Sequence, residues 1–324
     1  MITMTNKEIY KKTLTFSIRG ALFDVAAFAV IIVCAVLGFI IAEKTTDIGI
    51  LGLVLGIIVG LIFFALILRY VSYTYKAGQI AMMTRAVTEG SLPDDVLAEG
   101  KRVVKERFLT VALYFGATRI IKVIFNELGR VLTKVGKAVG GKEGNGIAAI
   151  INIIVQTIVA YLCDCCLGWV FFRKDENAAK ATCEGAVIFF KHWKVFAENM
   201  GRVFGIGLAS LVSIGGVFTA LFYSIAARFP DAFTALANEL ASSGQLDDKD
   251  AFLGDPTALM IVTAAICAVM VWGVIHSIFV KPFVLAGVLR NFLNSGKEDI
   301  PSEEAFAMLD EKSKRFRKLH EGLS

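Results

Sequence analysis

Apolar residues gather into six long segments that are separated by short turns or by polar, charged stretches. A transmembrane helix needs about 20 consecutive, mainly apolar residues, and several of these segments reach that length. We therefore predict an all-α, polytopic integral membrane protein with amphipathic helices beside the membrane. The expected transmembrane domain is residues 1–300 and a charged tail helix occupies 301–324. The predicted spans are 22–42, 48–70, 108–128, 147–172, 203–227 and 257–280.

The two longest polar stretches, residues 71–107 and 173–202, have the periodicity of amphipathic helices. A helix is expected to begin near residue 95, with Ser91 or Asp94 as its N-cap, and to continue into the third span without a stop.

Charge sets the expected orientation. The chain carries a formal net charge of +5 and is 56% apolar. The N-terminus, both polar stretches and the tail are basic, whereas residues 228–256 are acidic. Positive residues favour the cytoplasmic side, so both termini are expected there, in the plasma or inner membrane of the cell. No soluble segment is long enough to suggest a nucleic-acid-binding domain.

The third predicted span carries a one-sided polar stripe. Steps of three or four residues keep its members on one helix face. Such a face requires water, lipid phosphate, carboxylates or a pore. The stripe can line an anion path, contact lipid headgroups, or be neutralised by the buried carboxylates Asp24 and Asp164. Its members are Arg119, Lys122, Asn126, Arg130, Lys134 and Lys137.

Other candidate residues lie inside the remaining spans. Asn152 and Gln156 are one helical turn apart and can contact a solute or join helices. His276 can act as a gate or proton relay, or be a packed, hydrogen-bonded residue. Glycines at every fourth position favour a tight helix contact within one subunit over a contact between subunits. They are Gly52, Gly56 and Gly60.

Neither a cofactor nor an enzymatic activity is expected. The chain has six cysteines and three histidines. The cluster at 163–166 lacks the second ligand pair that a structural zinc site needs, so free thiols and no metal are expected. Nucleotide-binding and hydrolase motifs are also absent.

Two stretches of the C-terminal half, "CDCCLGWVFFRKDENAAKATCEGAVIFFKHWKVFAEN" and "FVKPFVLAGVLRNFLNSGKED", resemble the choline transporter-like family in the order of their features. That family has a Cys-rich span end, a basic amphipathic segment and a further span. The resemblance implies transport of a choline-like solute. The chain is similar as well to small, uncharacterised multi-span prokaryotic membrane proteins.

Three functional hypotheses follow. The first is a channel or transporter for small anionic solutes, with the stripe lining the path and homo-oligomers formed through the glycine face. The second is a membrane scaffold or lipid-interacting assembly factor, in which basic helices bind anionic headgroups. The third is the choline-like transporter.

Overall fold

The computed structural model describes residues 4–46, 49–108, 116, 118–119, 122, 145–192, 203–242, 254–312 and 314–321. Every regular element among these residues is helical. The chain divides into unit 1, residues 1–200 and 282–324, and unit 2, residues 201–281. Four of the described helices are long and apolar enough to cross a membrane: Asn6–Thr45, Leu51–Glu89, Val203–Ala226 and Pro256–Glu298.

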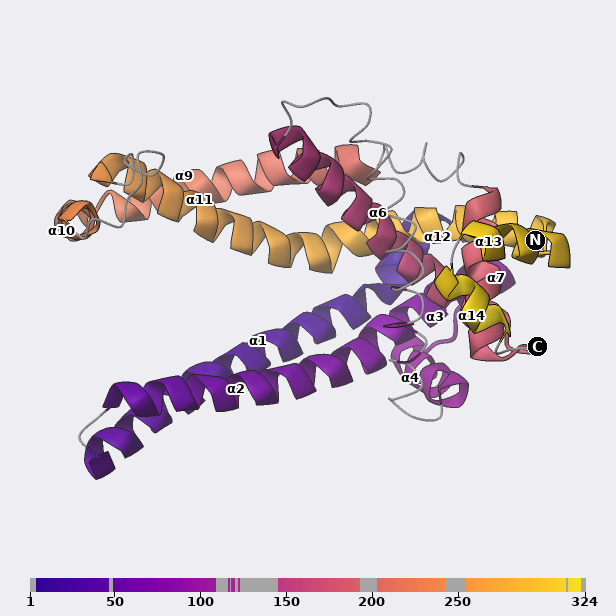
Figure 1. Ribbon diagram of the computed structural model, residues 1–324, viewed down its shortest axis with the longest axis horizontal. Helices are drawn as coiled ribbons and strands as arrows, with labels where there is room; N and C mark the ends of the chain where they lie inside the picture. The colour runs from indigo at the N-terminus through magenta and orange to yellow at the C-terminus, as the bar shows by residue number, and fades with distance from the viewer. Residues whose placement is uncertain are drawn as a thin grey trace. The chain divides into compact units, whose positions relative to one another are not determined.

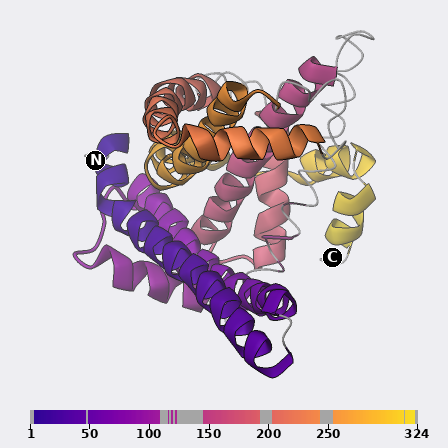
Figure 2. The same cartoon turned by 90° about the vertical axis from the view of Figure 1, so that its left-hand side faces the viewer.

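In unit 1, α1 (Asn6–Thr46) and α2 (Gly49–Val71) form a long antiparallel pair, side by side in Figures 1 and 2. Thr5 and Glu8 start α1 with a capping box, in which each side chain accepts a backbone N–H from the other residue. From residue 22 onwards the pair is apolar on most sides. Leu22, Val25 and Phe28 are each more than half exposed, a surface suited to lipid.

Glycines set the distance between these two helices. A Cβ added at Gly52 would lie 2.0 Å from the carbonyl oxygen of Gly38, and one at Gly56 would lie 2.2 Å from that of Cys34. A Cβ at Gly60 would lie 2.7 Å from the Cα of Ile31. The backbones therefore meet directly, and the glycine face of α2 is occupied by α1 of the same chain.

Both helices continue beyond the apolar surface into a compact helical core of unit 1. The first part of α1 buries Ile9, Thr13 and Phe16 on one face, and α2 leads through a π-helical segment into α3. The fully buried Trp169 lies in the C-terminal half of α6. The elements of this core are η1 (Ser72–Lys76), α3 (Ala77–Glu89), α4 (Val96–Arg107), the C-terminal half of α6 (Asn145–Phe172), α7 (Ala178–Lys191) and α12 (Lys281–Glu298).

The fourth predicted span is thus only partly free to meet lipid. Its second half, Val159–Phe172, is buried almost throughout and packs against α3 and α7. An apolar helix in a protein core and one in a bilayer have similar composition, so hydropathy does not distinguish the two surroundings.

The third predicted span does not continue from the helix before it. Asp95, rather than Ser91 or Asp94, caps α4 by accepting the N–H of Ala98. The helix ends at Arg107 because Phe108 is extended and buried, with its ring 5.7 Å from that of Phe171. The Tyr73 hydroxyl also donates to the Phe108 carbonyl.

The C-terminal tail is folded onto unit 1 as two helices, α13 (Glu303–Lys312) and α14 (Lys314–Glu321), both in contact with α7. Phe316 is fully buried and stacks on Phe306. The side chain of Arg317 donates to the carbonyl of Asp310, which holds the two helices together.

Asp299 joins the end of α12 to the end of α7, and we expect this contact to make stability depend on pH. The hydrogen bond from Lys191 lowers the pKa of the Asp299 carboxyl. A depressed carboxyl pKa stabilises the fold above the unfolded pKa, and the contribution is lost as pH falls through the folded pKa. Asp299→Asn should therefore unfold at a lower temperature than the wild type at neutral pH, and the two should converge in acid.

The measurement is thermal unfolding in detergent at neutral pH and in acid. Asp94→Asn is the control, because Asp94 is exposed and enters no ion pair with another described residue, so this variant should follow the wild type at both pH values. A difference between wild type and Asp299→Asn that is equal at both pH values would contradict the Lys191 contact.

Unit 2 is a second apolar helix pair. Val203–Ala226, which includes η2 (Leu211–Gly215) and α9 (Gly216–Ala226), packs along α11 (Pro256–Ile275). Asp255 caps α11, and α10 (Pro230–Ser242) also contacts α11 (Figure 1). Large apolar side chains such as Val212, Val217 and Met270 are at least 60% exposed. The helix continues without a break from α11 through η4 (His276–Val280) into α12.

Candidate functional site

Two members of the basic stripe lie among the described residues. Arg119 and Lys122 are helical, and both side chains are exposed. Within the described part of the chain neither enters an ion pair. Their spacing of three places them on one helix face. The other four stripe members, Asn126, Arg130, Lys134 and Lys137, lie outside the described residues.

The two carboxylates that could neutralise the stripe do not pair with its described members, Arg119 and Lys122. Asp164 is buried in α6, with Oδ1 2.8 Å from the Nζ of Lys76, the last residue of η1. Asp24 is exposed on the apolar surface of α1. The structure thus brings Asp164 together with a lysine of the core rather than with Arg119.

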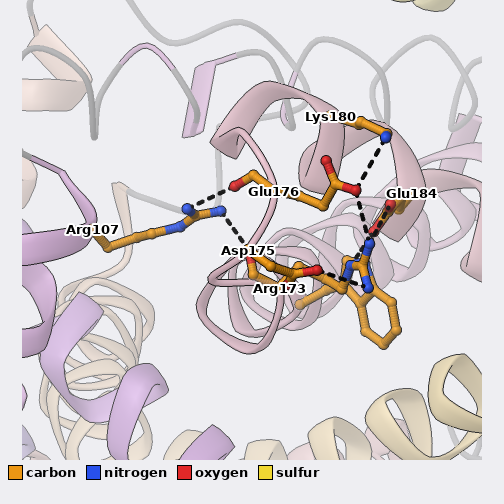
Figure 3. Close-up of polar contacts among 7 residues, drawn as sticks. Arg107, Arg173, Asp175, Glu176, Lys180 and Glu184 are labelled. Carbon is orange, nitrogen blue, oxygen red and sulfur yellow. Dashed lines mark hydrogen bonds and ion pairs between the residues drawn. The ribbon is translucent and has the colours of Figure 1, made fainter.

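A network of charged groups joins the two ends of the segment that carries the stripe (Figure 3). Arg107 is the last residue of α4, and Arg173 follows the end of α6. The Arg107 guanidinium donates to the backbone carbonyls of Arg173 and Glu176, at 2.9 Å each. These contacts hold the end of α4 beside the end of α6.

The centre of this network is a buried carboxylate on α7. Glu184 accepts from the indole Nε1 of Trp169 at 2.8 Å and from the Nε of Arg173 at 3.1 Å. Glu176 accepts from Arg173 and from Lys180, at 3.1 Å each. Arg173, Glu176 and Glu184 are each paired with an opposite charge and hydrogen-bonded, as buried ions must be, so these three side chains fix geometry rather than offer a free ligand.

The remaining sequence candidates are dispersed. Gln156 is exposed on α6, and the backbone of Asn152 lies one turn before it. His276 is in unit 2, where it contacts Ser210 and Trp272.

A surface cavity of about 210 Å³ lies between α3, α4 and the end of α6. Its lining includes Arg85, Glu89 and Lys174. Arg85 bonds Glu89 at 2.7 Å and Glu99 at 2.8 Å, and Lys174 lies 4.0 Å from Glu89. Since opposite charges already meet here, the cavity has little net attraction for an ion.

All six cysteines are free thiols. Burial raises the pKa of the Cys183 thiol to about 12, which leaves it protonated and unreactive at neutral pH. Across the described ranges, no group of three or more His, Cys, Asp or Glu side chains is placed to hold a metal.

Comparison with family models, with curated proteins and with solved structures gives no match to this chain. The resemblance to the choline transporter-like family therefore stays a prediction.

The structural roles of three residues were not predicted from the sequence. Arg107 and Glu184 looked like ordinary members of polar amphipathic segments, and Ser210 like a neutral residue of an apolar span. A usable signal was present only for Glu184, since it is the one acidic residue within the apolar stretch 181–190. A lone acid at that position needs a buried partner.

Proposed function

We propose that the chain is an integral membrane protein whose six crossings form three hairpins, with both termini and the core of unit 1 on the cytoplasmic side. The two apolar helix pairs support the first and third hairpins. The bonds from Arg107 to the chain after α6 support the second, because a segment that starts and ends at one place crosses an even number of times. The basic charge of the cytoplasmic segments supports the orientation.

We infer that the protein moves small anionic solutes through the membrane along the face that carries Arg119 and Lys122. The observation that carries this inference is that both side chains are exposed while Asp164, their nearest expected counter-charge, is bonded to Lys76. Cationic side chains that face a water-filled path lower the barrier for anions. The network at Arg107 and Glu184 would hold this hairpin at its base.

Anion flux into liposomes that contain the purified protein tests the proposal. We expect Lys122→Glu and Arg119→Glu each to lower flux by roughly tenfold, because reversing a charge beside the path removes the local enrichment of anions. Lys105→Glu is the matched control, since Lys105 is an exposed lysine of α4 that lies off the stripe. It should leave flux close to the wild-type rate.

Equal flux in the wild type and in all three variants would show that the stripe does not line the path. Folded protein that gives no flux above empty liposomes would instead favour the headgroup hypothesis. In that case Lys122→Glu should weaken binding of anionic lipid.

A further inference from the structure

A small polar cluster lies within the apolar helix pair of unit 2. The Ser210 hydroxyl accepts from the indole Nε1 of Trp272 at 3.1 Å and lies 3.3 Å from the Nδ1 of His276. Ser210 is buried, and the rings of Trp272 and His276 are 5.0 Å apart. Exposed apolar residues flank the cluster on both helices: Leu208 and Val212 on one, Val274 and Phe279 on the other.

The hydrogen bonds of Ser210 identify the tautomer of His276. A serine hydroxyl has one proton and two acceptor positions. Ser210 donates that proton to the carbonyl of Gly207 at 2.7 Å. The Ser210 oxygen must therefore accept the hydrogen bonds from both Trp272 and His276. The Nδ1 of His276 therefore carries a hydrogen. In the neutral ring, Nε2 is then the unprotonated, basic nitrogen.

The backbone is irregular on both sides of this contact. The π-helical segment η2 begins directly after Ser210, and η4 begins at His276 itself. The N–H of Lys281 donates to the His276 carbonyl, the wide spacing of a π turn. Such bulges are frequent at functional sites in helices. An ionisable side chain among apolar residues of a membrane helix is, in the same way, most often functional.

We propose that Nε2 of His276 is a proton-binding site inside the membrane, and that the protonated ring then binds the transported anion. A hydronium ion gives its proton to the Nε2 lone pair and leaves as water, and the ring gains one positive charge. Nδ1–H continues to donate to Ser210, so the new Nε2–H is the donor that faces an anion. This second step rests on the proposed function.

Few other charges act on this ring. Lys281 lies five residues after His276 in the same continuous helix. Ser210, Trp272 and the Gly207 carbonyl are neutral. The other described titratable groups on the packed elements of unit 2 belong to the far end of the helix pair, at or near the turns that hold α10. They are Tyr223, Arg228, Asp231, Glu239 and Asp255; the exception is the neutral thiol of Cys267, in the middle of α11.

Tryptophan emission of the full-length protein in detergent, measured against pH, tests proton binding without any assay of transport. A protonated imidazole quenches an indole in contact with it, and Trp272 is in contact with His276. We expect a reversible loss of emission on acidification that is absent in His276→Asn. Asparagine can still donate to Ser210 from the position of Nδ1, but it cannot bind the proton. His320→Asn, the same change in unit 1, should keep the wild-type response.

Ser210→Ala examines the tautomer separately. Loss of the hydroxyl removes an acceptor that favours the charged ring more than the neutral one, so the midpoint of quenching should move to lower pH. An acid response that is the same in the wild type, His276→Asn and Ser210→Ala, or no response in any of them, would overturn the proton site.

Flux measurements test the coupling. With chloride as the probe, wild-type uptake should rise when the outside is acidic, whereas His276→Asn should lose that dependence. Quenching that depends on His276 without any wild-type flux would keep the proton site and reject the proposed function. Wild-type flux whose pH dependence is unchanged in His276→Asn would keep the proposed function and reject the coupling.

Discussion

Replacement of Glu184 by alanine is expected to lower the free energy of unfolding by about 3–5 kcal/mol, because it leaves buried partners without their counter-charge. Glu184 has 4% of its side chain exposed, and Arg173 has 17%. The substitution removes the acceptor for both the Trp169 indole and the Arg173 guanidinium. Asp175 and Glu176 remain near Arg173, so we expect the lower part of that range.

Denaturant unfolding in detergent, followed through tryptophan emission, measures this loss. The matched control is Glu106→Ala. Glu106 also pairs with an arginine, Arg102, but 58% of its side chain is exposed. Exposed ion pairs contribute less than about 1 kcal/mol, so this control should remain near the wild type. Losses of equal size in the two variants would mean that Glu184 is not buried.

Glu184→Gln separates charge from hydrogen bonding at the same position. Glutamine keeps an oxygen that can accept from Trp169 but cannot neutralise Arg173. A loss intermediate between those of wild type and Glu184→Ala is expected. If Glu184→Gln is as unstable as Glu184→Ala, the ion pair with Arg173 provides most of the stabilisation, since the indole contact is retained.

The sequence predicted the helical class and the apolar parts of the long helices, because those depend on composition within one segment. The predicted second span, 48–70, corresponds closely to α2, and the apolar part of α1 follows the prediction of 22–42. The helices nevertheless extend further. The first turns of α1 bury Ile9 and Phe16 in the core, and a buried face of this kind does not register in a search for apolar runs.

Contacts between distant segments are the part that the sequence could not supply. The partner of Asp164 proved to be Lys76 because η1 lies beside α6, which no local pattern reveals. His276 was recognisable as an ionisable residue in an apolar span, but its partner Ser210 belongs to another helix. In the same way, hydropathy does not register the contacts of α6 with α3 and α7, because bilayers and protein cores select the same side chains.

The glycine contact between α1 and α2 gives the second large expected effect. Gly56→Ala should destabilise the hairpin, because the added Cβ would lie 2.2 Å from the Cys34 carbonyl oxygen and 2.8 Å from its carbon. These are backbone atoms that cannot rotate away, so the two helices must separate. Overpacking of this kind costs about 1–3 kcal/mol, and loss of the close contact adds to it. Thermal unfolding in nanodiscs is the measurement.

Gly216→Ala is the control, since Gly216 lies inside a helix of unit 2 with nothing within 4 Å of an added Cβ. Alanine also favours helix over glycine, so the control should be as stable as the wild type or more so. The concentration of protein distinguishes the two interpretations of the glycine face. Contact within one chain predicts a loss in Gly56→Ala that is independent of protein concentration, whereas contact between copies predicts a loss that diminishes as concentration rises.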